Sequence, residues 1–447
     1  MTAESFLEKI NSGDAKNIFS SIYGKDETAL ERYKKITLDF ININTGEFPE
    51  VNGEVKIFSV PGRTELGGNH TDHNMGRVLA ASIDLDAAAI AAPRKDMQVF
   101  FRSTGHKDVI VDLEDLSIRE DEKGETAALI RGIAADFTAQ GTPVKGFTAY
   151  CDSRVFTGSG LSSSAAIEVL FAKIFDSLYC GGNRSSLELA KAGQRAENIY
   201  FGKPSGLMDQ AAAAMGGVIC IDFKHKGNNA EASGDYPKIE RVKFNLMEAG
   251  YTLCVINTGG SHADLLADYS AIPNEMKAIA GVFDKAFLRE IDENLFMEKI
   301  PELRKTAGDR AVLRAMHFFN ENDRVIKMKQ ALEEAGKTAG AETAGINKFL
   351  SLVNESGDSS WQLLQNIYSP SHPKAQEVSL ALALTKNFLK GKEGACRVHG
   401  GGFAGTIQAY IKHENLEEYT KLMNKNFGNS AVKILSIRQA GAVELVL

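Results

Sequence analysis

Thr157-Gly158-Ser159-Gly160-Leu161-Ser162-Ser163-Ser164-Ala165-Ala166 is a glycine- and serine-rich stretch that runs directly into a strongly periodic segment. Between Ala165 and Tyr179 the apolar residues recur at the spacing of one helix face, namely Ile167, Leu170, Phe171, Ile174, Phe175 and Leu178. Glycines allow a tight turn and a close approach of the backbone to a ligand. The unpaired N–H groups and the dipole at a helix start both favour an anion. The stretch therefore predicts a turn that holds a phosphate group at a helix N-terminus.

The same stretch has a simpler explanation when it is taken alone. Serine is a preferred N-cap residue, so a serine-rich cap on an ordinary helix accounts for Ser162, Ser163 and Ser164 equally well. The common nucleotide-binding turn, in which Gly-Lys-Ser or Gly-Lys-Thr follows the glycines, is absent from this stretch. Further motifs are needed to choose between a helix cap and a phosphate site.

The segments around this turn predict a mixture of helices and strands. The first 50 residues have the pattern of amphipathic helices, and Val55–Val60 predicts a strand that ends at Pro61-Gly62. Val78–Ala92 predicts another strand or a pair of strands, and Ser186–Tyr200 predicts a second helix.

A polar, glycine-containing stretch at residues 224–236 is the first candidate for a domain boundary. Beyond it the patterns predict, in order, a strand at Tyr251–Asn257, a helix-rich tract from about Ala271 to Gly357 with a solvated connection at Glu333–Gly345, and strands at Thr406–Ile411 and Val432–Val446. A chain of 447 residues is too long for one hydrophobic core. Since helices and strands mix without regular alternation, we expect two α+β domains, residues 1–235 and 236–447.

The composition excludes several classes of protein. Asp and Glu outnumber Lys and Arg by 58 to 51, which argues against a surface that coats nucleic acid. The N-terminus has no secretory signal pattern, and no apolar run reaches the ~18–20 residues of a membrane span. We expect a cytoplasmic protein that acts on small molecules, without nucleic-acid or membrane partners, as a monomer or a weak homo-oligomer. The five cysteines form no C-x-x-C pair, so we expect buried, reduced thiols.

Four further segments complete an ordered set of motifs. Pro61–His73 (PGRTELGGNHTDH) precedes the turn, and Gly206–Gln210 (GLMDQ), Asn257–Tyr269 and Arg397–Gly405 (RVHGGGFAG) follow it. In content and order they resemble the galactokinase branch of the kinases that handle galactose, homoserine, mevalonate and phosphomevalonate, over most of the chain. The resemblance implies an N-terminal ribosomal-protein-S5-domain-2-like domain, a C-terminal ferredoxin-like domain and an active site between them. It also implies transfer of phosphate from ATP, with Mg²⁺, to the anomeric hydroxyl of a monosaccharide, with galactose as the first candidate substrate.

The resemblance implies roles for four reaction-site residues. Asp209 receives or steers the proton of the attacking hydroxyl, and Arg63 stabilises charge on the phosphate and keeps Asp209 ionised. Ser164 and Glu197 match a pair that binds Mg²⁺, an ion that prefers a few oxygen ligands shared with substrate phosphate. Taken alone, Asp209 is better explained as a polar cap of an alanine-rich helix, and a surface charge is the alternative for Arg63 and for Glu197.

The resemblance also implies a sugar site and an ATP site. The residues that match sugar-contacting positions are Asn69, His70, Asp72, Gly206 and Tyr269. Those that match the ATP-binding turn are Gly158, Ser159, Gly160, Leu161, Ser162, Ser163 and Ser164. The alternative for the His70-Thr71-Asp72-His73 segment is a metal site, although its spacing is not that of His-Glu-x-x-His and no third ligand is marked.

The chain departs from the family pattern at a few positions. Galactokinases usually have glutamate at the position of Asn69 and asparagine at that of Glu65, so an exchange of the two polar types is one interpretation. A neutral Asn69 that tolerates a uronic acid is a second, and a simple replacement with galactose still bound is a third. Tyrosine is usual at His73, and Ala404 replaces a glycine. A non-catalytic sensor of sugar and ATP is the alternative from another class, and the complete Ser162–Ala166 run argues against it.

Overall fold

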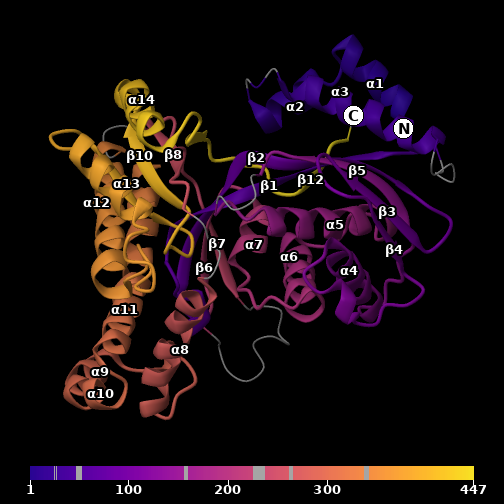
Figure 1. Ribbon diagram of the computed structural model, residues 1–447. Coiled ribbons are helices and arrows are strands. Elements are labelled where there is room, and N and C mark those ends of the chain that lie inside the picture. The colour runs from indigo at the N-terminus through magenta and orange to yellow at the C-terminus, as the bar shows by residue number, and fades with distance from the viewer. Residues whose placement is uncertain are drawn as a thin grey trace.

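Two β-sheets of different size lie side by side, and helices cover both (Figure 1). The computed structural model describes residues 1–24, 26, 28–46, 53–155, 160–224, 237–260, 265–336 and 342–446. Within these residues the larger sheet has eight strands and the smaller sheet has four. The predicted mixture of helices and strands is confirmed.

The larger sheet is built around the long strand β2, which pairs with β1, β5 and β6. Its strand order is β12-β1-β2-β5-β3-β4, with β6 beside β2 and β7 beside β6. The pairs are antiparallel except for β3 with β5, which is parallel. The strands are β1 (Lys56–Gly67), β2 (Arg77–Pro93), β3 (Gln98–Ser103), β4 (Val109–Asp112), β5 (Phe147–Ser153), β6 (Val218–Asp222), β7 (Lys238–Val242) and β12 (Val443–Glu444).

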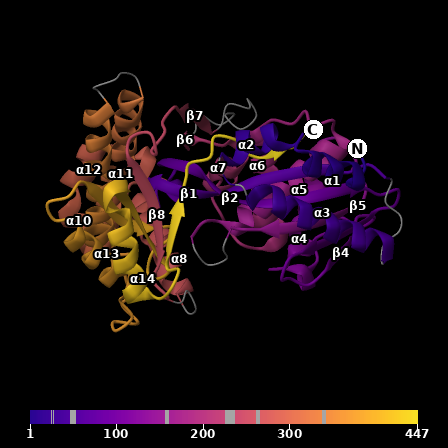
Figure 2. The same ribbon diagram turned by 90° about the horizontal axis from the view of Figure 1, so that it is seen from above.

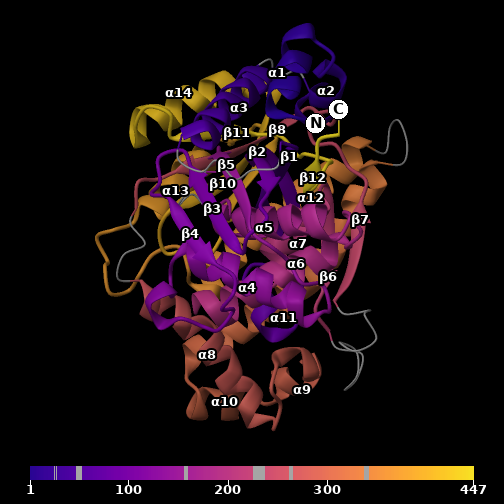
Figure 3. The same cartoon turned by 90° about the vertical axis from the view of Figure 1, so that its right-hand side faces the viewer.

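Helices bury both faces of the larger sheet (Figures 1 and 3). Ala87, Ala89 and Ala91 of β2 belong to one hydrophobic core, whereas Ala88 and Ile90 belong to another. Successive side chains of a strand point to opposite faces, so the two cores lie on the two sides of the sheet. On one side lie α4 (Thr126–Ala139), α5 (Ser163–Tyr179), α6 (Ser186–Arg195), the π-helix η3 (Ala196–Phe201) and α7 (Met208–Met215). On the other side lie α1 (Ala3–Ser12), α2 (Lys16–Tyr23) and α3 (Thr28–Gly46).

The smaller sheet has the strand order β11-β8-β10-β9 and is packed against long helices (Figure 2). Its strands are β8 (Tyr251–Asn257), β9 (Gly394–His399), β10 (Thr406–Lys412) and β11 (Val432–Leu435). The helices of this region are α8 (Leu266–Val282), α9 (Glu293–Glu298), α10 (Ile300–Thr306), α11 (Asp309–Ala335), α12 (Glu342–Ser359), α13 (Glu377–Phe388) and α14 (Leu416–Phe427). Short helical segments are η1 (Asp72–Asn74), η2 (Glu120–Glu122), η4 (Leu288–Glu290), η5 (Ser360–Leu364) and η6 (His413–Asn415).

Two predicted strands differ from the observed ones. The strand expected to end at Pro61-Gly62 continues as β1, and a register shift between Pro61 and Arg63 accommodates a residue that has no N–H to donate. The single strand expected at Val432–Val446 is two short strands, because the chain leaves the smaller sheet after β11 and pairs as β12 with β1.

Part of the predicted organisation stays a prediction. β7 and β12 lie beyond residue 235 yet pair with strands of the larger sheet, and the division into two domains at that residue stays a prediction. Most of the expected boundary stretch, residues 225–236, lies outside the described residues, as does 337–341 in the expected helix connection.

A buried cluster around Asp86 joins the chain ends to the larger sheet. Arg32 of α3 and Arg438 of the C-terminal segment pair with the carboxylate, and the Tyr23 hydroxyl donates to it over 2.6 Å. Burial alone would raise the pKa of Asp86, but the two guanidinium groups outweigh it and lower that pKa. The helices α1–α3 are thus tied to the sheet by charge as well as by apolar contact.

All five cysteines are free thiols, and the expectation of buried thiols is confirmed for four of them. Those of Cys151, Cys220, Cys254 and Cys396 are buried, and Cys180 is partly exposed. Among the described residues, no helix combines the length and apolar character that a membrane crossing needs.

Candidate active site

The two residues predicted to be catalytic form a bidentate ion pair. Arg63 lies in β1, and Asp209 lies in the first turn of α7. Nε of Arg63 donates to Oδ1 of Asp209 over 2.6 Å, and Nη2 donates to Oδ2 over 2.7 Å. Nη1 of Arg63 donates to the carbonyl oxygen of Gly160 in the predicted phosphate turn. Because two parallel N–H···O bonds fix the plane of a carboxylate, Asp209 is held in one orientation beside that turn.

Asp209 is kept ionised by its neighbours. Burial alone would raise the pKa of its carboxyl, but Arg63 and the Ser162 hydroxyl outweigh burial and hold the pKa below its ordinary value. Ser162 donates from Oγ to Oδ2 of Asp209. Its backbone is left-handed, with φ of 56°, which costs a non-glycine residue about 1–2 kcal/mol. Strain of this kind persists where contacts impose it, and it clusters at functional sites.

The predicted phosphate turn leads into the first turn of α5. Ser163 and Ser164 stand at this helix start, where N–H groups have no partner within the helix. Gly160 has φ of 71°, and a Cβ at this position would lie 3.1 Å from Nδ1 of His399. Two residues predicted for the turn lie outside the described part of the chain, namely Gly158 and Ser159.

Glu197 lies in the π-helix η3 within a buried network of oxygens. Its carboxylate accepts hydrogen bonds from Nζ of Lys203 over 2.8 Å, from Nε2 of Gln210 over 3.0 Å and from the Ser205 hydroxyl. The same Nε2 of Gln210 donates to Oε2 of Glu168 over 2.8 Å. Oε1 of Glu168 is buried without a hydrogen-bond partner in the described part of the chain.

These oxygens suit a hard divalent cation. Burial and the nearby Glu197 raise the pKa of Glu168 well above its ordinary value, and the Gln210 hydrogen bond and the charge of Lys203 offset this rise only in part. Oxygen ligands are what Mg²⁺ prefers, and it usually takes one or two from protein. Within the described ranges no group of three or more His, Cys, Asp or Glu residues could hold a metal, which gives no support to the alternative site at His70–His73.

Asp72 and Gly206, two predicted sugar-site residues, face each other closely. A Cβ at Gly206 would lie 2.3 Å from Oδ2 of Asp72, so only glycine leaves room for this carboxylate. Oδ1 of Asp72 accepts the backbone N–H of His73 over 3.0 Å. Beside the pair is a cavity of about 410 Å³, also lined by Lys191 and Gln194 of α6. Small-molecule sites begin at about 300 Å³, so this cavity is large enough for a monosaccharide.

Three other predicted sugar-site residues hold the glycine turn Gly400–Gly402. Nε2 of His70 lies 2.9 Å from the carbonyl oxygen of Gly401. The Tyr269 hydroxyl donates to the carbonyl oxygen of Gly402 over 2.8 Å, and Nδ2 of Asn69 donates to the carbonyl oxygen of Gly400 over 2.8 Å. Because a carbonyl only accepts, Nε2 of His70 carries the hydrogen. Burial lowers the pKa of His70 to about 4, so its ring is neutral and Nδ1 is an acceptor.

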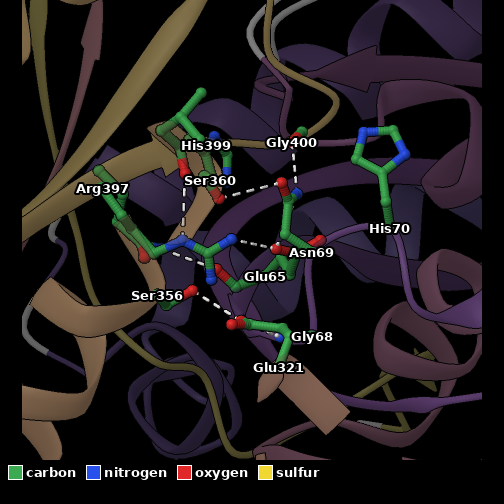
Figure 4. A network of polar contacts seen from close by, with 12 residues as sticks. Glu65, Gly68, Asn69, His70, Glu321, Ser356, Ser360, Arg397, His399 and Gly400 are labelled. Carbon is green, nitrogen blue, oxygen red and sulfur yellow. Dashed lines mark hydrogen bonds and ion pairs between the residues drawn. The ribbon is translucent and has the colours of Figure 1, made fainter. Parts of the chain in front are cut away.

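Asn69 and Glu65 lie in contact, and both are buried (Figure 4). Nδ2 of Asn69 donates to Oε1 of Glu65 over 3.2 Å, and Oδ1 of Asn69 accepts from Nδ2 of Asn366 over 2.9 Å. Glu65 is paired with Arg397 of β9. The chain therefore has its carboxylate at position 65 and its amide at position 69, side by side. Asn69 is 1% exposed, and its contact with a sugar stays a prediction.

Several residues of the site were assigned no role from the sequence. Lys203 and Gln210 bind Glu197, while His317 and Glu321 of α11 bind the backbone that precedes His70. Gln210 adjoins Asp209 in the quoted GLMDQ segment, so a polar side chain in an alanine-rich helix was a usable signal. His317 and Glu321 lie about 250 residues from the loop they bind, and local patterns do not predict that contact.

Comparison with known proteins identifies similar proteins over most of the chain. The galactose-binding signature of galactokinases matches residues 47–93, and the N-terminal domain of GHMP kinases matches residues 128–217. The galactokinase of Lactobacillus helveticus is 30% identical over 380 residues, which cover 83% of this chain and 89% of that protein. The galactokinase of Lactococcus lactis subsp. lactis is 30% identical over 391 residues, covering 85% and 90%.

Solved structures share the fold. Lactococcus lactis galactokinase complexed with galactose has a TM-score of 0.73 at 24% identity, covering 92% of this chain and 100% of that chain. A mevalonate kinase has a TM-score of 0.56 at 17% identity, covering 86% and 99%. The arrangement of sheets and helices is therefore that of the GHMP kinases.

Proposed function

The chain belongs to the galactokinase family, and from this premise we propose that it transfers the γ-phosphoryl group of ATP to the anomeric hydroxyl of galactose. The observation that carries the proposal is the Arg63–Asp209 pair beside the phosphate turn. Phosphoryl transfer depends on positioning, on charge stabilisation and on a group that receives or steers the hydroxyl proton. An ionised carboxylate and a cation at the start of a phosphate-binding helix supply these functions.

Asp209 acts on the sugar hydroxyl. Its carboxylate stays ionised near neutral pH, so it can accept a hydrogen bond from the hydroxyl and steer its proton as the oxygen attacks. Ser162 and Arg63 hold the carboxylate in one orientation, in which it can accept the sugar hydroxyl. Arg63 also lies next to the turn, where its charge stabilises the transferring phosphate.

The ATP phosphates lie along the turn that ends at Ser164 and against the start of α5, where N–H groups and the helix dipole favour anions. Ser164 and Glu197 are the residues that would hold Mg²⁺, which neutralises charge on the phosphate oxygens when bound. The spare buried oxygen of Glu168 beside Glu197 supports a cation at this place.

The sugar occupies the cavity beside Asp72 and Gly206. Asp72 accepts hydrogen bonds from neighbouring hydroxyls through Oδ2, and the neutral His70 ring has Nδ1 as an acceptor. Tyr269 offers an aromatic edge against the same turn of glycines. Asn69 is also assigned to this site, although its amide is already hydrogen-bonded to protein groups.

The finer architecture belongs to the same proposal. We assign residues 1–235 to a ribosomal-protein-S5-domain-2-like domain and 236–447 to a ferredoxin-like domain, with the active site between them. The smaller sheet with its covering helices supports the second assignment. A cytoplasmic monomer or weak homo-oligomer without nucleic-acid or membrane partners is also our expectation.

Phosphorus NMR with purified protein, ATP and Mg²⁺ tests the proposal. The sugars tested are galactose, N-acetylgalactosamine, glucose and galacturonate, and a matched reaction contains excess chelator to remove Mg²⁺. We expect a sugar 1-phosphate signal with galactose that disappears with chelator. Turnover of galacturonate alone would instead assign a changed specificity, and ADP release without any sugar phosphate would refute the transfer.

A further inference from the structure

The loop that carries His70 and Asp72 has a strained backbone. His70 and Met75 adopt left-handed φ angles of 57° and 59°, which non-glycine residues rarely take. Gly68 has φ of 95°, and a Cβ there would lie 2.4 Å from the carbonyl oxygen of Arg77. Conformations of this kind persist only when surrounding structure over-determines them. Contacts from outside the loop must therefore hold it in place.

One such contact comes from Glu321 in the middle of α11. Its Oε1 accepts the backbone N–H of Gly68 over 3.0 Å and the Ser356 hydroxyl over 2.6 Å (Figure 4). Glu321 is fully buried, and Arg324 pairs with its other carboxylate oxygen. Burial alone would raise the pKa of Glu321, but opposing interactions, with the charge of Arg324 first and that of Arg397 among them, lower that pKa to about 2. Gly68 is thus held by a charged acceptor, the stronger kind of hydrogen bond.

A second contact comes from His317, one helical turn earlier. Its Nε2 lies 2.9 Å from the carbonyl oxygen of Asn69, and its Nδ1 lies 2.9 Å from Oγ of Ser359. Because the carbonyl only accepts, Nε2 carries a hydrogen. Burial lowers the pKa of His317, so the ring is neutral and the Ser359 hydroxyl donates to Nδ1.

We infer that His317 and Glu321 are positioning residues of the sugar site. Residues four apart on a helix share one face, and these two bind backbone groups of consecutive residues, the N–H of Gly68 and the C=O of Asn69. Those groups lead directly into His70, so α11 sets the direction in which the sugar-binding side chains project. The inference rests on the proposed function and extends it to a helix that does not touch the sugar.

The same support reaches the glycine turn on the other side of the loop. The Asn69 side chain donates to the carbonyl oxygen of Gly400, and the His70 ring donates to that of Gly401. A shift of the Asn69 peptide would therefore move the loop that carries His70 and Asp72 and disturb its contacts with the glycine turn. Loss of the contacts from α11 weakens sugar binding more than it slows the chemical step, because Asp209 and Arg63 are held by other contacts.

Steady-state kinetics of His317→Leu and His317→Gln test the inference. Leucine removes both ring nitrogens, whereas the glutamine amide keeps one donor and one acceptor, as the neutral imidazole does. We expect KM for galactose to rise about tenfold or more in His317→Leu, the fold-change of one lost buried hydrogen bond, with kcat and KM for ATP within about threefold of wild type. His317→Gln restores much of the sugar KM.

Asn322→Ala serves as the matched control, since Asn322 is a mostly buried polar residue of α11 whose side chain binds Arg289. It leaves the sugar KM unchanged even if it destabilises the protein, because a smaller active fraction lowers kcat and not KM. An unchanged sugar KM in His317→Leu, or an equal rise in Asn322→Ala, would overturn the inference while the kinase assignment stands. Absence of turnover in the wild-type protein would overturn both.

Discussion

Replacement of Gly206 by alanine perturbs the sugar site through one predictable collision. The added Cβ would lie 2.3 Å from Oδ2 of Asp72, and the next nearest atoms are also in the Asp72 side chain. Ordinary van der Waals contact requires a separation of well over 3 Å, so the carboxylate must move by about 1 Å. Gly206 does not need a left-handed backbone, so the substitution adds no strain of its own. The protein should therefore fold normally while Asp72 rotates away from its position.

The displacement determines the expected size of the effect. Each hydrogen bond between a charged carboxylate and a sugar hydroxyl contributes about 1.5–3 kcal/mol, so loss of one raises KM for galactose by about tenfold to a hundredfold. KM for ATP should change little, because the phosphate turn lies on other elements. A coupled ADP assay at varied galactose and varied ATP measures both constants, and thermal unfolding measures the fold.

Gly281→Ala is the matched control for this prediction. Gly281 lies in α8 with nothing within 4 Å of an added Cβ and no left-handed φ, so the same substitution meets no obstacle there. It should leave both KM values unchanged and stabilise the helix slightly. A sugar KM for Gly206→Ala that equals the wild-type value, with Gly281→Ala behaving as expected, would refute the assignment of Asp72 to the sugar.

Three further predictions concern other parts of the molecule. Ser162→Ala removes the hydroxyl donor to Asp209 and should lower kcat/KM by about tenfold, a change that the ADP assay detects and whose absence would show that the contact has no functional role. Burial lowers the pKa of His399 to about 3. Between about pH 6.5 and 3 the histidine is therefore protonated in the unfolded chain and neutral in the native protein, so native stability is lost as pH falls through that window. The stability advantage of wild type over His399→Gln should therefore shrink by about 1.4 kcal/mol per pH unit below 6.5 in urea titrations, and a constant difference would contradict the neutral ring. Arg32→Met leaves Asp86 buried beside fewer cations and should lower the free energy of unfolding by about 3–5 kcal/mol in the same titrations, whereas a loss below about 1 kcal/mol would contradict its structural role.

Local patterns in the sequence predicted those parts of the fold that depend on local structure. The periodic apolar residues after the phosphate turn form α5 as expected, and the strand expected at Tyr251–Asn257 is β8 with the same bounds. The pairing of Arg63 with Asp209 across 146 residues was implied by the resemblance to the galactokinase family and not by a local pattern. The helix and the strand each have a periodic signal within a short window.

Features that depend on a change of partner were missed. β1 continues past Pro61 because its neighbour β2 accommodates a register shift, which the sequence of β1 does not reveal. The segment Val432–Val446 forms two strands because the chain moves from one sheet to the other. Strand periodicity does not indicate which sheet a strand joins.

The surroundings of Asn69 show the same limit at the active site. The sequence raised an exchange of carboxylate and amide between Glu65 and Asn69, and the two side chains do lie in contact. It did not reveal that Arg397 pairs with the Glu65 carboxylate, or that Asn366 donates to Oδ1 of Asn69. Those partners come from distant segments, and only the packed structure brings them together.

Turnover by Asp209→Asn tests the central claim most directly. Asparagine keeps the size of the side chain but removes the charge that pairs with Arg63 and the basic oxygen that can take the hydroxyl proton. With the fold and galactose affinity verified by thermal unfolding and calorimetry, we expect kcat for sugar phosphorylation to fall by about 10²–10⁴-fold. A folded, sugar-binding Asp209→Asn protein whose kcat stays within about threefold of wild type would contradict the claim that this carboxylate serves the transfer.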